Sequence, residues 1–89
     1  MNTLKSEKII IDEFKKLEKS AKTASDYAKL AREILNTINE YQGYSKEISK
    51  ECKLWASELY TTAGDLIMDE TGDQIKSWEY WKLSGKLKK

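Results

Sequence analysis

The side chains of this sequence that could do acid, metal or nucleophilic chemistry are a few spaced carboxylates and one thiol. The pairs Asp65/Asp69 and Glu47/Glu51 are each four residues apart, so each pair would share one face of a helix and could hold a metal ion or a proton. The sequence has no histidine, which removes the commonest general base and metal ligand, and its one cysteine is Cys52. We therefore expect no enzymatic activity, no metal or other cofactor and no small-molecule substrate, with the carboxylates in solvent and Cys52 in the core.

Charge is nearly balanced over the whole chain but unevenly distributed along it. Sixteen basic and fifteen acidic residues give a net charge of +1, so the long-range attraction to nucleic acid is weak. Residues 58–73 hold only acidic charges, whereas residues 74–89 are rich in lysine. Two interpretations stay open: the two blocks neutralise each other in adjacent helices, or the tail formed by Lys86, Lys88 and Lys89 contacts phosphate.

Length and composition indicate one small helical domain over residues 1–89. The chain has no proline and only four glycines, and 39% of its residues are hydrophobic against 35% charged. No apolar run approaches the roughly 20 residues that a membrane span needs, and the first residues do not resemble a signal peptide. The expected location is the cytoplasm, with no membrane association.

The hydrophobic spacing predicts an all-α fold, a small antiparallel four-helix bundle with helices at about 4–21, 24–42, 45–70 and 73–87. Thr23 is expected to cap the second helix, with Asp26 in its first turn, and Asp73 to cap the fourth. Nothing between Leu4 and Gln42 forbids one long helix, so a three-helix bundle with a long first helix is the alternative. The face expected to be buried on the first helix is Ile10, Phe14, Leu17 and Ala21. The corresponding face of the third helix is Ile48, Cys52, Trp55, Leu59, Ala63 and Leu66, widened by Ala56, Tyr60 and Ile67.

The segment from Tyr60 to Ser84 resembles one unit of the tetratricopeptide-repeat (TPR) family. The residues that carry the resemblance are Tyr60, Ala63, Gly64 and Ile67 in the first helix of the hairpin, Gly72 and Asp73 at the turn, and Ser77, Trp81 and Ser84 in the second. The match departs from the family pattern by one extra residue in the turn, by serines where alanines are usual and by a missing final proline. The resemblance implies two helices that approach closely through small residues, with aromatic rings filling the gaps beside them.

The last helix carries apolar residues on two sides. At helical spacing, Ile75, Trp78, Trp81 and Gly85 fall on one side, and Tyr80, Leu83 and Leu87 fall nearly opposite. Because one helix of a small bundle can turn only one side to the core, the other side is expected to be an exposed apolar patch. We expect the set Tyr80, Leu83 and Leu87 to bind a partner, with Lys86 at the rim setting its orientation.

These patterns favour a non-enzymatic protein–protein interaction or self-association module with TPR-like packing, whose partner is another protein or a second copy. The alternative is a small nucleic-acid-associated regulatory protein that acts through the basic last turn. Tryptophan and tyrosine beside lysine suit base stacking, but their helical spacing suits a core better.

Overall fold

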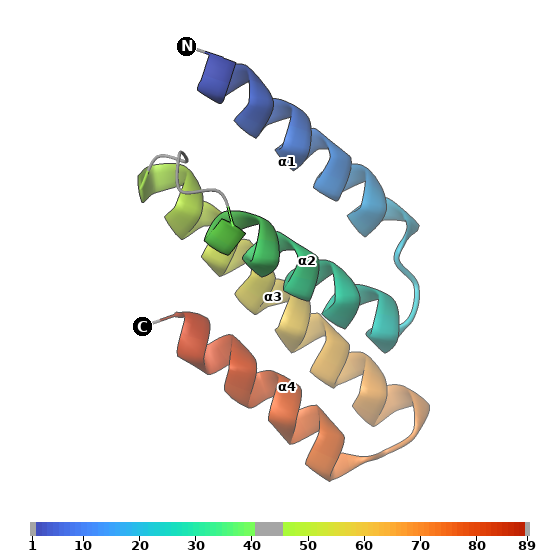
Figure 1. Cartoon of the computed structure of the whole chain (residues 1–89). Coiled ribbons are helices and arrows are strands. Elements are labelled where there is room, and N and C mark those ends of the chain that lie inside the picture. The colour runs from blue at the N-terminus through green and yellow to red at the C-terminus, as the bar shows by residue number, and fades with distance from the viewer. Residues whose placement is uncertain (1, 41–45, 89) are drawn as a thin grey trace.

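Over the part of the chain that the structure describes, the fold is made of four α-helices, as the hydrophobic spacing predicts. The computed structural model describes residues 2–40 and 46–88, without the side chains of residues 2–8 and 10. The helices are α1 (Asn2–Ser20), α2 (Ala24–Glu40), α3 (Lys46–Glu70) and α4 (Gln74–Leu87), shown in Figure 1. The prediction of an all-α four-helix bundle is confirmed, and the three-helix alternative is wrong because α1 ends at Ser20. The expected helix ends at 42 and 45 lie outside the described residues.

The break between α1 and α2 is held by a reciprocal cap at Thr23 and Asp26. The Asp26 N–H donates to Thr23 Oγ1 (3.2 Å), while the N–H groups of Lys22 and Thr23 donate to Asp26 Oδ2 (3.1 and 3.2 Å). The hydrogen bond from the Lys22 N–H, and after it the one from the Thr23 N–H, hold the pKa of the Asp26 carboxyl below its usual value because they stabilise the charged form. Two side chains three residues apart therefore satisfy backbone N–H groups that would otherwise lack partners at a helix start.

A second cap forms the tight turn between α3 and α4. Gly72 has a φ of +69°, a conformation that favours glycine, and its N–H donates to the carbonyl oxygens of Ile67 and Met68 (both 3.1 Å). Asp73 then caps α4, since its side chain accepts from the Lys76 N–H at 3.1 Å. The turn reverses the chain and lays α4 antiparallel to α3 (Figure 1).

The helices form a flattened row with α1 and α4 at its two ends and with α2 and α3 overlapping between them (Figure 1). Extensive contacts join α2 to α3 and α3 to α4, while α1 contacts α2 over a much smaller surface. The Cα atoms span 47 × 28 × 16 Å, so the molecule is thin in one direction. α1 also reaches α3, where the Phe14 and Trp55 rings meet edge to face at 6.2 Å and Trp55 Nε1 donates to Glu18 Oε2 at 3.1 Å. In this arrangement α4 forms one end of the row and α3 lies inside it.

The hydrophobic core lies between α2 and α3. Its members are Ala24, Ala28, Leu30, Ala31 and Ile34 from α2, and Cys52, Ala56, Leu59, Tyr60, Ala63 and Ile67 from α3. The stripe expected on α3 therefore faces the core, with Ile48, Trp55 and Leu66 half-buried beside it. The prediction for α1 is wrong at Leu17, which is 49% exposed, because α1 packs through Phe14 and Ile11 on an adjacent face. The side chain of Ile10 lies outside the described part.

The centre of the contact between α3 and α4 is made by small and polar residues. Gly64 of α3 is buried, and a Cβ built on it would lie 2.5 Å from Trp81 Nε1 and 3.0 Å from the Ser77 carbonyl oxygen. Trp81 Nε1 donates to Asp65 Oδ1 at 3.1 Å, which fixes the indole ring over Gly64. Ser57 and Ser84 face each other across the contact, with their hydroxyl oxygens 2.8 Å apart. The two helices therefore approach closely because glycine and serine leave room for it.

The two buried serines of α4 are expected to respond to alanine in opposite ways. The Ser77 hydroxyl has no hydrogen-bond partner within the described residues, so we expect Ser77→Ala to stabilise the fold by about 1 kcal/mol. The Ser84 hydroxyl bonds to Ser57 (2.8 Å) and Thr61 (2.7 Å), so Ser84→Ala should destabilise it by a similar amount, about 1 kcal/mol. Urea denaturation followed by circular dichroism measures both. Equal effects of the two substitutions would contradict this account of the contact.

Candidate functional site

The structure turns a different side of α4 to the core from either of those that the sequence suggested. Ser77 and Ser84 are buried at the centre of the contact with α3, and Tyr80, Trp81 and Leu87 are half-buried on its two shoulders. The core side thus lies between the two apolar sides expected from helical spacing. Trp81, from the first of those two sides, lies at one edge of the core side. Tyr80 and Leu87, from the second, lie at its other edge.

Two of the predicted partner-binding residues are therefore half-buried. Tyr80 stacks on Tyr60 of α3, with ring centroids 6.0 Å apart and an interplanar angle of 17°, and Leu87 packs against the core. Leu83 is 40% exposed and Lys86 is exposed. The expectation that Tyr80, Leu83 and Leu87 form one exposed patch is wrong, because the first and the last are held by α3. A part in partner binding for the exposed Leu83 and Lys86 stays a prediction.

The exposed apolar patch of α4 is made by Ile75 and Trp78, which lie one turn apart. Ile75 is 77% and Trp78 is 63% exposed, the two highest values among the large hydrophobic residues described. The Lys82 ammonium lies over the Trp78 ring, 5.7 Å from its centroid, within the range of a cation–π contact. A shallow depression runs along these three side chains and is also lined by Gln74 and Glu79. We call Ile75, Trp78, Lys82 and Gly85 the outer face of α4.

The signal that could have identified this face was present in the sequence. Large apolar residues occur at helical spacing on two sides of α4, so they do not indicate which side faces the core. The serines at 77 and 84 lie seven residues apart, and two turns of small residues indicate the line of closest helix approach. The TPR resemblance placed Ser77 and Ser84 at that line, with Trp81 between them.

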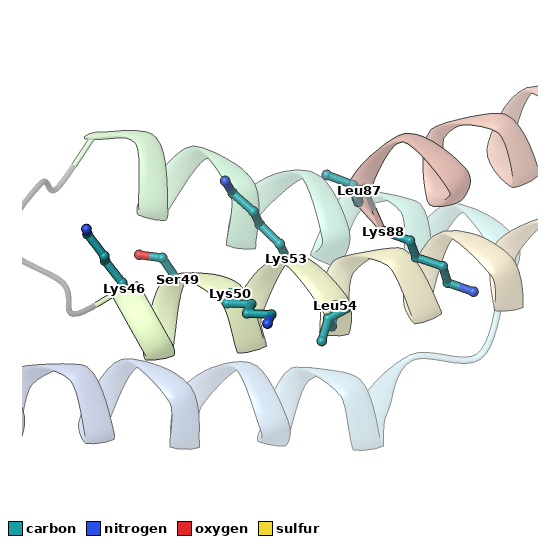
Figure 2. A pocket seen from close by; sticks show the side chains of 7 residues that line it. All are labelled: Lys46, Ser49, Lys50, Lys53, Leu54, Leu87 and Lys88. Atoms are coloured by element: carbon teal, nitrogen blue, oxygen red, sulfur yellow. The ribbon is translucent and has the colours of Figure 1, made fainter.

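A second surface with a distinct chemistry lies at the other end of α4. A pocket of about 410 Å³ opens where the first turns of α3 meet the end of α4, and Figure 2 shows the side chains around it. The side chains that line it are Lys46, Ser49, Lys50, Lys53 and Leu54 of α3, with Leu87 and Lys88 at the end of α4. We call this the lysine pocket. No carboxylate of the described residues lines it, so all the charged residues of its lining are lysines, whose side chains fan out in different directions (Figure 2).

The lysines of α3 are placed against the electrostatic preferences of a helix. Lys46 and Lys50 are four residues apart and Lys50 and Lys53 are three apart, spacings at which like charges destabilise a helix by about 0.2–0.5 kcal/mol per pair. Lys46 also lies in the first turn of α3, near the positive end of the helix dipole. Glu47 in the same turn partly offsets this, being three residues before Lys50. Lys88, by contrast, follows the last turn of α4, where a positive charge is favourable.

The residues considered for catalysis or metal binding are dispersed. Asp65 accepts the Trp81 N–H, Asp69, Glu47 and Glu51 are exposed, and Cys52 is buried. Among the described side chains there is no group of three or more His, Cys, Asp or Glu residues placed to hold a metal ion. Within residues 2–40 and 46–88, no helix is both long and apolar enough to cross a bilayer.

Comparison with known proteins adds nothing to these two surfaces. No family model matches the chain, and neither a curated protein nor a solved structure is similar to it. The functional proposal for this chain therefore rests on the outer face of α4 and on the lysine pocket.

Proposed function

We propose that this chain is a non-enzymatic self-association module whose TPR-like α3–α4 hairpin presents the outer face of α4 to a second copy of the chain. The observation that carries the proposal is the exposure of Ile75 and Trp78, one turn apart on α4. Figure 1 shows α4 at one end of the helix row. Tryptophan is the residue type most enriched among those that dominate binding energy, and isoleucine beside it adds apolar area. An apolar pair of this kind in water favours association.

The outer face is complementary to itself in an antiparallel arrangement. Ile75, Trp78, Lys82 and Gly85 follow one another at spacings of three, four and three, the pattern of a helix–helix seam. An antiparallel pairing about residue 80 sets Ile75 opposite Gly85 of the second copy. A Cβ on Gly85 would meet nothing within 4 Å, so this glycine leaves space for the isoleucine. Such a two-fold arrangement repeats every contact twice, as closed dimers do.

Charge on the outer face supports the same pairing. Trp78 lies opposite Lys82 of the second copy, which would extend the cation–π contact that the two residues already make within one chain. Glu79, on the flank of the outer face, comes within reach of the same lysine across the two-fold axis. In this pairing Lys82 of the outer face and Glu79 on its flank each lie near the opposite charge of the second copy.

The expected dimer is weak. α4 has 14 residues and is therefore about 21 Å long, so one pair of such helices buries less area than a standard stable interface. We expect association in the micromolar range, with monomer and dimer in concentration-dependent exchange.

Trp78→Ala is expected to remove this self-association. The substitution deletes the largest exposed ring of the outer face and should weaken dimerisation at least about tenfold, as loss of a hot-spot residue does. Sedimentation-velocity experiments over a range of concentrations measure the change. Because Trp78 is exposed in the monomer, the circular dichroism and the unfolding midpoint of the variant should stay close to those of the original protein.

Leu17→Ala is the matched control for this substitution. Leu17 is also a large exposed apolar residue, 49% exposed, but lies on α1 at the opposite end of the row. We expect it to leave dimerisation unchanged. A strictly monomeric protein at the highest concentration reached, or an equal effect of Leu17→Ala, would refute self-association through the outer face.

The second candidate function is that of a nucleic-acid-associated regulatory protein acting through the basic last turn of α4. It is favoured by the lysines that α3 adds beside Lys88, which make this end of the molecule more basic than residues 86–89 alone suggest. It ranks second because the lysine pocket has no aromatic side chain among its described lining residues, and bases bind single-strand sites largely by stacking on such rings.

A further inference from the structure

We propose that the lysine pocket is a binding site for a compact ligand that carries two or more phosphate groups. The lysine ammonium group is a point charge with three hydrogen-bond donors and a common binder of phosphate in proteins. Four lysines and Ser49 line the pocket, and their flexible side chains offer more hydrogen-bond donors than one phosphate group can use. This site is separate from the outer face of α4, and the proposal goes beyond self-association.

The unfavourable placement of the α3 lysines points to an anion. Lys46, Lys50 and Lys53 repel one another along one side of α3, and no described carboxylate enters the pocket to offset them. A bound anion would relieve this repulsion, since each lysine would gain an opposite charge. The position of Lys88 is favourable without a ligand, because a positive charge is favoured at the end of α4. Lys88 adds a fourth lysine to the pocket, from a second helix.

The dimensions of the pocket suit a short chain of phosphates. With a rise of about 1.5 Å per residue, Lys50 lies about 6 Å and Lys53 about 10 Å from Lys46 along the axis of α3. This spacing lets two neighbouring lysines contact different phosphate groups of one ligand. A volume of about 410 Å³ falls within the usual range of small-molecule sites, about 300–1,000 Å³.

The lining favours this ligand over a nucleic acid. The apolar members of the pocket are Leu54 and Leu87, which give no ring for a base to stack on. Trp78, the most exposed aromatic residue of α4, lies ten residues before Lys88 and belongs to the outer face. The ligand class is therefore the oligophosphate, whether free or as the triphosphate of a nucleotide.

The test is calorimetric titration of the full chain with inorganic tripolyphosphate, with a nucleoside triphosphate and with a single-stranded oligonucleotide. We expect saturable binding of tripolyphosphate that weakens as salt is raised. The double variant Lys50→Gln/Lys53→Gln should weaken it roughly tenfold, since each exposed charge pair accounts for a factor of about two to five. Lys16→Gln, at an exposed position of α1, removes one positive charge away from the pocket and should leave the affinity unchanged.

Weaker binding by the double variant would not be caused by unfolding. The double variant removes two like-charge pairs from α3, so its unfolding midpoint should equal or exceed that of the original protein. It also leaves the outer face intact, so dimerisation measured by sedimentation should be unchanged. The calorimetric titration tests phosphate binding and sedimentation tests dimerisation, so either proposal can be refuted without the other.

Each outcome of the titration decides the proposal. Equal affinity for tripolyphosphate and the nucleoside triphosphate identifies the phosphate chain alone as the recognised group, and tighter binding of the nucleotide identifies the nucleotide as its source. No saturable binding of either compound at millimolar concentration would overturn the proposal. An equal loss in Lys16→Gln, or tighter binding of the oligonucleotide than of both phosphate compounds, would overturn it as well.

Discussion

Replacing Gly64 with alanine is expected to destabilise the fold by about 1–3 kcal/mol, the usual cost of adding a carbon to a closely packed contact. The new Cβ would lie 2.5 Å from Trp81 Nε1 and 3.0 Å from the Ser77 carbonyl oxygen. The indole ring would have to leave Asp65, and the Ser77 backbone cannot move without moving α4 away from α3. Alanine favours helix over glycine by about 1 kcal/mol, so the observed loss is what remains after this gain. Urea denaturation measures it.

Gly85→Ala is the control on the same pair of helices. Gly85 also lies within a helix, but a Cβ there would meet nothing within 4 Å. Only the gain in helix propensity should remain, so we expect this variant to be more stable by about 0.5–1 kcal/mol. If both substitutions changed stability in the same direction, the close approach of α3 and α4 at Gly64 would be refuted.

Leu59→Ala is expected to have the largest effect of any single substitution considered, a loss of about 2–5 kcal/mol. Leu59 is 2% exposed and lies near the middle of α3, within the core shared with α2. Its removal leaves a cavity that helices on either side cannot easily fill. A small domain has about 5–15 kcal/mol of stability in total, so thermal unfolding should begin many degrees lower.

Leu54→Ala tests whether burial causes that loss. Leu54 lies five residues earlier on α3 and is 41% exposed. The same change of side chain should therefore cost less than about 1 kcal/mol. Differential scanning calorimetry of both variants gives the comparison. A loss at Leu54 as large as the loss at Leu59 would mean that α3 does not turn the described face to the core.

The features that the sequence predicted correctly are those determined by near neighbours. The caps formed by Thr23 with Asp26, and by Asp73 with Lys76, each join residues three apart, so their chemistry can be recognised from a short stretch. The buried stripe of α3 was also predictable. This long helix lies between α2 and α4 and makes extensive contact with both.

The features that the sequence did not predict depend on which helices are neighbours. α4 makes extensive contact with α3 alone, and its apolar residues do not say which of its sides turns inward; the buried serines decide it. Leu17 was misplaced for the same reason, because α1 lies at the other end of the row. The lysine pocket joins Lys46 to Lys88, which are 42 residues apart, and only the antiparallel register of α3 and α4 brings them together.

The order of the helices in the row also affects how the chain reaches its native state. The extensive contacts join helices that follow one another in sequence, α2 with α3 and α3 with α4. Contacts between consecutive segments require only short loops to close, so little chain entropy is lost before they form. Proteins with such low contact order fold within microseconds to milliseconds, and the α3–α4 hairpin, joined by a short capped turn, is suited to begin the process.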